Sequence, residues 1–232
     1  MKIKKAMLFA AGFGERMRPL TFKNPKPLLP LGEKSLIDYS IFYLKKFGVE
    51  EVVINTHYLG EKIEQHVGDG KKYGLKINYS KEIQLLGTGG GLKQAEVFFK
   101  NEEAFFTLNS DTLINCDLHE VTQFHEEQKT PAMLVVTPWQ EGYTRIQIGN
   151  GRLLNIGCGD HLFTGLTLLT PKIFGVLPAT QSNLITDGVM PLMQKAKSIA
   201  CFIHEGYWRD IGTLANYQAA QEEWAASHLT RR

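Results

Sequence analysis

The stretch Leu8-Phe-Ala-Ala-Gly-Phe-Gly-Glu-Arg-Met-Arg-Pro-Leu-Thr21 decides the fold class of this 232-residue chain. It starts inside a short apolar run, residues 3–11, and passes into a glycine loop at Gly12-Phe-Gly14. A short apolar run that ends at glycines is typical of a buried strand. Four prolines between residues 15 and 32 exclude a regular helix there, so the strand is expected to lead into a long ordered loop.

Beyond this stretch, short apolar runs alternate with amphipathic segments. Further strands are predicted over residues 51–56, 76–79, 104–109, 131–138, 163–169 and 200–203, with a hairpin over 145–156 around Asn150-Gly151. Helices are predicted over residues 35–47, 59–67, 92–99, 118–128, 184–195 and 215–226. This alternation predicts an α/β fold with right-handed crossovers and a mostly parallel sheet. No linker or repeat divides the chain, so a single domain over residues 1–232 is expected.

Composition and charge exclude several classes of protein. The hydrophobic fraction is 43% and the charged fraction 22%, which is ordinary for a globular protein and excludes bulk disorder. No apolar run reaches the roughly 18–20 residues of a membrane span, and the N-terminal run is too short for a secretory signal. A net charge of +2 gives no sign of nucleic-acid binding. Because the three cysteines are scattered, a disulfide framework is not expected. The protein is expected to be cytoplasmic and to have no nucleic-acid or membrane partner.

The glycine loop after the first strand predicts a phosphate-binding site. Glycines at the carboxyl end of a strand let backbone amides approach a ligand closely. The dinucleotide fingerprint is not met, since Met17 stands where its third glycine would be, and this argues against a nicotinamide-dependent dehydrogenase. Arg16 and Arg18 offer planar forks for phosphate oxygens, and Lys26 offers a point charge between two prolines. Three cations in one proline-rich loop favour a nucleoside triphosphate.

Two further regions carry polar groups at predicted strand and helix ends. The glycine run Gly87-Thr-Gly-Gly-Gly91 precedes a predicted helix, where free backbone amides can line a base or an anion. Asp111 follows a predicted strand, and Asp210 lies in Trp208-Arg-Asp-Ile-Gly-Thr213 near the C-terminus. A single aspartate at a strand end is often only a helix cap. Two aspartates from distant parts of the chain fit a shared Mg²⁺, which prefers one or two carboxylates together with phosphate oxygens and water.

Five strings of residues occur in a fixed order along the chain: Leu-x-Ala-Ala-Gly-x-Gly-x-Arg-Met-x-Pro-Leu-Thr, Pro-Lys-Pro-Leu, Gly-Thr-Gly-Gly, Asn-x-Asp and Trp-x-Asp-x-Gly-Thr. Together they resemble the sugar-1-phosphate nucleotidyltransferase family, the nucleotide-sugar pyrophosphorylases. The likeness runs from Lys5 to the region of Tyr217. It implies a three-layer, Rossmann-like α/β fold with a mostly parallel mixed central sheet. Residues 1–115 would form the nucleotide-binding half, and residues 116–232 the sugar-phosphate-binding half.

The resemblance also implies roles for individual residues. Arg16 would grip the β- and γ-phosphates, and Lys26 would bridge the α-phosphate and the incoming sugar phosphate. Asp111 and Asp210 would hold the Mg²⁺ cofactor. Backbone and side-chain groups of the two glycine loops and of one strand end would bind the nucleotide: Ala10, Ala11, Gly12, Gly14, Gln84, Gly87, Thr88, Gly89 and Asn109.

The sugar site departs from the family pattern. Many relatives carry a Glu-Lys-Pro string whose lysine binds the sugar phosphate, and this chain has none. The string Ile185-Thr-Asp187 is present, but Asn183 stands where many relatives have the glutamate that binds sugar hydroxyls. The candidate sugar-binding residues are therefore Gly165, Asn183 and Asp187.

The implied reaction joins a nucleoside triphosphate to a sugar 1-phosphate, giving a nucleotide sugar and pyrophosphate. The compact branch that the chain resembles most transfers uridylate to N-acetylmuramate 1-phosphate, a step of peptidoglycan recycling. Guanylyl transfer to mannose or heptose 1-phosphate is the alternative, and a non-catalytic nucleotide-sugar sensor is the alternative from another class. A monomer or homodimer is expected, without the left-handed β-helix acyltransferase domain of bifunctional relatives.

Overall fold

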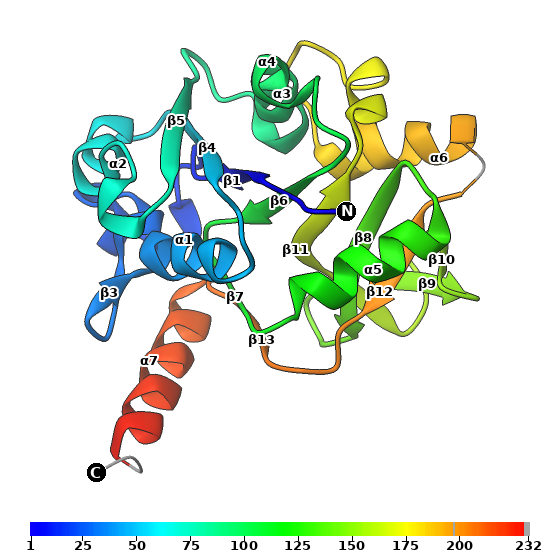
Figure 1. Ribbon diagram of the computed structural model, residues 1–232. Helices are drawn as coiled ribbons and strands as arrows, with labels where there is room; N and C mark the ends of the chain where they lie inside the picture. Colours follow the sequence, from blue (N-terminus) through cyan, green and yellow to red (C-terminus); the bar gives the residue numbers. More distant parts are fainter. Residues whose placement is uncertain (197, 230–232) are drawn as a thin grey trace.

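The computed structural model describes residues 1–196 and 198–229, and its centre is a sheet of nine strands (Figure 1). Neighbouring strands follow one another in the order β5, β4, β1, β6, β11, β8, β12, β10, β9. Their bounds, in that order, are Lys76–Lys81, Glu51–Thr56, Lys5–Phe9, Phe105–Asn109, His161–Leu169, Ala132–Pro138, Ala200–Ile203, Arg152–Ile156 and Ile146–Gly149.

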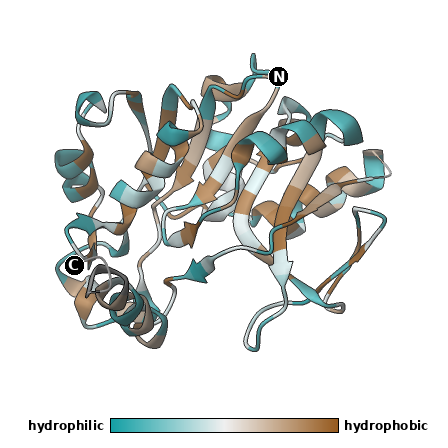
Figure 2. Cartoon of the chain, turned by 60° about the horizontal axis from the view of Figure 1, so that its bottom comes forward, coloured by the Kyte–Doolittle hydropathy of each residue, from teal (hydrophilic) through white to brown (hydrophobic). Residues whose placement is uncertain are grey.

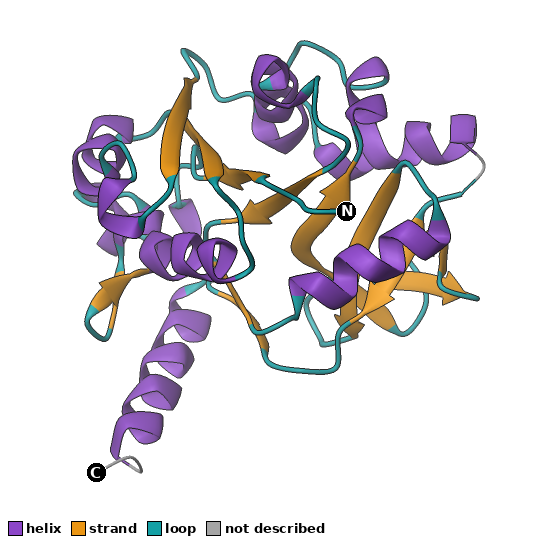
Figure 3. Ribbon diagram, viewed as in Figure 1, coloured by secondary structure: helices purple, strands orange, loops and turns teal. Residues whose placement is uncertain are grey.

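The sheet is mixed, as predicted, but only four of its eight neighbouring pairs are parallel, and its two halves differ in strand direction. In the first half β1 is central, and it is parallel to β4 on one side and β6 on the other. In the second half β11 is antiparallel to both of its neighbours, β6 and β8, while β12 is parallel to β8. The predicted hairpin around Asn150-Gly151 is present as β9 and β10 at the far edge (Figure 3). Because β6 pairs with β11, one continuous sheet joins the two halves of the chain.

Helices cover both faces of the sheet and complete the predicted three layers. Alternate residues of β1 point to opposite faces: Leu8 packs with α1 (Leu36–Lys46), α2 (Gly60–Val67) and α5 (Leu118–Gln128). Met7 packs with α3 (Gly87–Gln94), α4 (Glu96–Phe99) and α6 (Met190–Ala196). Hydrophobic residues accordingly concentrate along the strands, and hydrophilic ones on the outer helix faces and loops (Figure 2). No helix among the described residues is long and apolar enough to cross a membrane.

A third, smaller core lies under α7 (Leu214–Leu229), which extends from the body of the molecule (Figure 1). It joins this helix to the proline-rich loop through buried Met17, Leu29, Leu31, Leu36, Ile211, Tyr217 and Ala220. The loop has no regular helix, as predicted, but folds into three short 3₁₀ turns at Glu15–Met17, Leu20–Phe22 and Lys26–Leu28.

Two parts of the secondary structure differ from the sequence prediction. A helix was expected over 92–99, but α3 begins at Gly87 inside the glycine run, and a separate turn, α4, follows Ala95. Close packing of α3 against residues 180–183 and Glu82 outweighs the low helix propensity of glycine there. Four very short strands were not predicted: β2 (Pro30–Leu31) pairs with β3 (Lys34–Ser35), and β7 (Thr112–Ile114) pairs with β13 (Trp208–Asp210).

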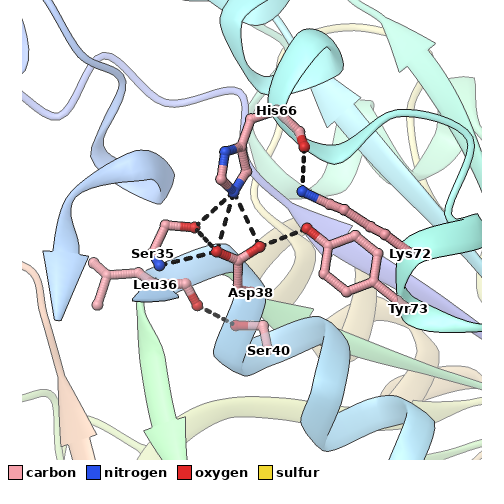
Figure 4. Close-up of polar contacts among 7 residues, drawn as sticks. All are labelled: Ser35, Leu36, Asp38, Ser40, His66, Lys72 and Tyr73. Atoms are coloured by element: carbon pink, nitrogen blue, oxygen red, sulfur yellow. Dashed lines mark hydrogen bonds and ion pairs between the residues drawn. The ribbon is translucent and has the colours of Figure 1, made fainter. Parts of the chain in front are cut away.

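The first turn of α1 is held by a buried carboxylate, Asp38 (Figure 4). Its Oδ2 accepts hydrogen bonds from the Ser35 amide at 2.9 Å and the Ser35 hydroxyl at 2.6 Å, and the Tyr73 hydroxyl donates to Oδ1. His66 Nε2 lies 3.0 Å from both carboxylate oxygens. Burial alone would raise the pKa of Asp38, but these hydrogen bonds outweigh it and lower the pKa to about 2. One turn later, the Ser40 hydroxyl lies within hydrogen-bond reach of the Ser110 carbonyl, beside Asp111.

Candidate active site

A cavity of about 260 Å³ opens at the carboxyl ends of β1 and β6. This is where open α/β sheets bind their ligands, because the loops that leave neighbouring parallel strands diverge there. Eight of the predicted site residues line it: Ala10, Ala11, Gly12, Lys26, Gly87, Thr88, Asn109 and Asp111. The remaining walls are Phe9, Pro27, Asn55, Leu85 and Ser110. Residues from five distant segments of the chain therefore meet around one cavity.

Asn55 and Glu82, which sequence reasoning missed, hold the two glycine loops in place. The Asn55 Oδ1 accepts a hydrogen bond from the Ala10 amide at 2.8 Å, and its Nδ2 donates to Glu82 Oε1 at 2.7 Å. The other oxygen of Glu82 accepts from the Leu86 amide at 2.8 Å. Both side chains are buried. The only signal in the sequence was the position of Asn55 near the end of a predicted strand.

Lys26, Asp111, Asp210 and Arg16 form a charged cluster at the mouth of this cavity. The Lys26 ammonium pairs with the Asp111 carboxylate, and both side chains are largely buried. Burial and the nearby charge of Asp111 together raise the pKa of Asp210, while Lys26 and Arg16 act in the opposite direction. The backbone of Gly212 lies close to both Asp210 and Arg16. A Cβ at this position would lie 2.5 Å from Asp210 Oδ2 and 2.8 Å from an Arg16 guanidinium nitrogen.

The two aspartates are brought together by the β7–β13 ribbon. Asp210 pairs with Thr112, the neighbour of Asp111, and the Ile211 amide donates to the Asp111 carbonyl at 2.8 Å. Among the described residues no third acidic, histidine or cysteine side chain joins them. Two buried carboxylates that lie close together suit a divalent cation, provided that phosphate oxygens and water supply the other ligands. The residues present therefore fit the expected Mg²⁺.

The glycine run serves close packing as well as ligand binding. A Cβ on Gly90 would lie 2.4 Å from the Thr180 carbonyl oxygen, and one on Gly91 would lie 2.5 Å from Glu82 Oε1. Gly89, expected to bind nucleotide, instead packs against Ser182, whose carbonyl accepts its amide at 2.9 Å. Only glycine lets α3 lie this close to residues 180–183 and to Glu82. This contact explains why the helix begins within the run.

A second cavity, of about 290 Å³, lies in the second half of the chain beside this packing contact. Its walls are Tyr143, Thr144, Ile146, Ile156, Leu162, Phe163, Asn183, Ile185 and Thr186. Five of these nine residues are apolar and none is charged. Of the three predicted sugar-binding residues, only Asn183 lines it. Asp187 caps the adjoining turn by accepting the Asn183 amide at 2.7 Å, and Gly165 lies against the Asn109 side chain.

The remaining predicted residues lie outside both cavity walls. Gly14 packs against Thr21 and the Lys26 side chain, and its carbonyl accepts the Thr21 hydroxyl at 2.8 Å. Gln84 lies on an exposed loop next to Leu85. A larger cavity, of about 390 Å³, lies between α1, β7 and α7, but it holds none of the predicted site residues. Its aromatic walls and lack of cations do not suit a triphosphate.

Known proteins share this sequence and this architecture. The family model described as "Nucleotidyl transferase" matches residues 5–150. The N-acetylmuramate alpha-1-phosphate uridylyltransferase of Neisseria meningitidis serogroup B is 34% identical, over 94% of this chain and 96% of that protein. The mannose-1-phosphate guanylyltransferase catalytic subunit beta of Dictyostelium discoideum is 31% identical over 90% of this chain. The chain spans only 61% of that second relative.

Solved structures agree on the fold. HddC from Yersinia pseudotuberculosis, determined in complex with GMP-PN, superposes with a TM-score of 0.79 at 21% identity, over 96% of this chain and all of that chain. The family match covers more than half of the chain, and the Neisseria relative is matched along nearly its whole length. The chain therefore belongs to the nucleotidyl transferase family, as the order of its motifs predicted.

Proposed function

We propose that this protein joins a nucleoside triphosphate to a sugar 1-phosphate, with release of pyrophosphate. The observation that carries the proposal is the convergence of Lys26, Arg16, Asp111 and Asp210 at the mouth of a cavity lined by glycine-loop backbone. Cations and paired carboxylates in one place suit phosphate groups and a divalent ion. The apolar second cavity nearby offers a place for the sugar.

The chemistry requires positioning and charge neutralisation rather than a general base. A sugar phosphate oxygen is already an anion when it attacks the α-phosphorus, so the barrier lies in bringing two anions together. Two like charges about 4 Å apart repel by roughly 4 kcal/mol at an effective dielectric constant near 20. Lys26 and Arg16 would offset this repulsion and stabilise the departing pyrophosphate. A bound Mg²⁺, held by Asp111 and Asp210, would supply further charge neutralisation on the phosphates.

UTP and N-acetylmuramate 1-phosphate are the substrates that we favour. The relative named for that reaction matches this chain over nearly the full length of both proteins. The uncharged, largely apolar walls of the second cavity suit an N-acyl substituent better than a ring of free hydroxyls. With these substrates the protein would serve cell-wall recycling in the cytoplasm. We expect the protein to act as a monomer or a homodimer.

Guanylyl transfer to mannose 1-phosphate is the second candidate. It is favoured by the similarity to mannose-1-phosphate guanylyltransferases, which extends over 90% of this chain at 31% identity. The charged groups described above would serve either base, because the cations and the paired aspartates act on the phosphates and not on the base.

The test is pyrophosphate release by the purified protein with Mg²⁺. UTP, GTP, dTTP and CTP are each combined with the 1-phosphates of N-acetylmuramate, N-acetylglucosamine, glucose, mannose and heptose. A signal confined to UTP with an N-acetyl sugar supports the first reading, and a signal confined to GTP supports the second. Asp210→Asn, purified in parallel, controls for contaminating enzymes. Silence across the panel from folded protein would contradict the proposed activity and favour the nucleotide-sugar sensor.

A further inference from the structure

The side chain of Tyr143 belongs to both sites at once. Its ring lines the apolar cavity assigned to the sugar. Its hydroxyl donates to Asp210 Oδ2 at 3.4 Å and accepts a hydrogen bond from Asn216 Nδ2 at 3.1 Å. Because the amide nitrogen of Asn216 can only donate, the hydroxyl proton of Tyr143 is directed toward the carboxylate. Among the residues that line the sugar cavity, Tyr143 is thus the one that contacts an aspartate of the charged cluster.

The surrounding residues fix where this hydroxyl lies. The Trp139 indole donates to the Tyr143 carbonyl at 2.8 Å, and the Arg145 guanidinium stacks 3.5 Å from the Trp139 ring centre. The Tyr143 ring meets Trp208 of β13 edge-on, with 5.2 Å between ring centres. Trp208 in turn donates to the Thr164 carbonyl at 2.8 Å. The ring is therefore held both by its own loop and by the strand that carries Asp210.

Asp210 lies among charges that act on its carboxylate in different directions. The negative charge of Asp111 lies close by, while the positive charges of Lys26 and Arg16 act in the opposite direction. The backbone of Gly212 lies against both Oδ2 and the Arg16 guanidinium. Competing charges of this kind do not by themselves select one orientation of the carboxylate. A neutral donor on one oxygen restrains the carboxylate and leaves the other oxygen available to a cation.

We propose that Tyr143 is a positioning residue, whose hydroxyl holds the Asp210 carboxylate in the orientation that receives the divalent cation. The inference rests on the proposed function for its biological meaning, but the hydroxyl–carboxylate contact can be tested by metal binding alone.

The experiment compares wild type, Tyr143→Phe, Asn216→Ala and the double variant. Mn²⁺ binding is measured from the free-ion electron paramagnetic resonance signal, with the protein alone and with UTP, so that no turnover occurs. Tyr143→Phe keeps the ring and the cavity wall but removes the donor. Tyr207→Phe is the matched control, since its hydroxyl donates at 3.0 Å to exposed Glu223, away from the charged cluster. Steady-state kinetics with Mg²⁺ provide the second measurement.

We expect Tyr143→Phe to weaken Mn²⁺ binding about fivefold to tenfold, the effect of one ordinary hydrogen bond, because the 3.4 Å contact is long for a charge-assisted one. Asn216→Ala should give a smaller loss of the same sign, and the double variant should be no worse than Tyr143→Phe. The KM for the nucleotide should stay within about twofold. Unchanged Mn²⁺ affinity in folded Tyr143→Phe, or a rise confined to the KM for the sugar phosphate, would overturn the inference. So would absence of Mn²⁺ binding by wild type, whereas wild type that binds Mn²⁺ but releases no pyrophosphate would overturn only the proposed function.

Discussion

At the scale of single side chains, Lys26 and Asp111 form an ion pair whose members are only 18% and 13% exposed. A pair this buried is costly to desolvate and is weak evidence for stability by itself. Its place at the mouth of the cavity gives it another purpose, because an arriving phosphate and cation can each take one partner. Lys26 would then exchange a carboxylate for phosphate oxygens, and Asp111 an ammonium for the divalent ion.

Replacing Lys26 by alanine should therefore damage turnover far more than folding. We expect Lys26→Ala to lower kcat by about 100-fold or more, the typical cost of losing one charged group that stabilises a transition state. The circular dichroism spectrum should be unchanged. Lys23→Ala, in the same loop but exposed, should leave kcat within about twofold. Near-normal turnover in Lys26→Ala would remove this lysine from the proposed chemistry.

The predicted site residues that the structure brings together around one cavity are those that stand in short motifs. Ala10–Gly12, Lys26, Asn109 and Asp111 all line the cavity that we propose binds nucleotide. Asn55, Glu82 and Tyr143 were missed because their importance comes from contacts with residues distant in the sequence. No local pattern marks such a contact. Gln84 was expected near the base but lies outside the cavity wall, and its role stays a prediction.

At the scale of elements, the start of α1 depends on the ionised form of Asp38. The pKa of Asp38 is about 2 in the folded protein, below its ordinary 3.8, so its stabilising effect is complete above about pH 4. The effect is lost as the pH falls toward 2, because the carboxyl group then takes up a proton in both states. The shift corresponds to about 2 kcal/mol of unfolding free energy.

Urea unfolding of wild type and Asp38→Asn checks this expectation. The variant should be less stable by about 2 kcal/mol at pH 6, and the difference should shrink steadily between pH 4 and pH 2. Glu50→Gln is a suitable control, since Glu50 is fully exposed and its ion pairs with Lys2 and Lys4 are at the surface. A difference that stays constant down to pH 2 would contradict the role given to the charge.

The packing of α3 against residues 180–183 also depends on a single residue, Gly90. Gly90→Ala would place a Cβ 2.4 Å from the Thr180 carbonyl oxygen, so helix and segment must separate. We expect a loss of about 1–3 kcal/mol in unfolding free energy, despite the better helix propensity of alanine. The KM for the nucleotide should rise, since Gly87 and Thr88 line its cavity. Gly175→Ala, where the added Cβ would meet nothing within 4 Å, is the control.

At the scale of the whole molecule, the β6–β11 pairing makes one sheet of both halves. We therefore predict that the chain unfolds in a single cooperative transition. All three tryptophans, Trp139, Trp208 and Trp224, lie in the second half of the sequence, and Trp224 also packs against Tyr39 of the first half. Their fluorescence therefore reports tertiary packing in the second half and at its contact with the first, whereas far-ultraviolet circular dichroism reports the secondary structure of the whole chain. The two urea midpoints should coincide. Separate midpoints would contradict a single domain over residues 1–232.

The overall architecture could be predicted further than its details. Apolar periodicity sufficed for the α/β class and for the longer helices and strands, because burial of one face produces that pattern directly. The β7–β13 ribbon was missed because strands of three residues are too short to show a period. The start of α3 was misplaced because glycine disfavours helix locally, and only its approach to residues 180–183 makes it favourable.

The β7–β13 ribbon has a consequence for how the protein is made. β7 and Asp111 are synthesised well before β13 and Asp210. A nascent polypeptide that has not yet reached residue 210 lacks the second carboxylate and the strand that holds it beside the first. Such a polypeptide could not hold a divalent ion between two aspartates, so under the proposed function it would not turn over nucleotide. Catalytic competence would then arrive only with β13, the later strand of the ribbon.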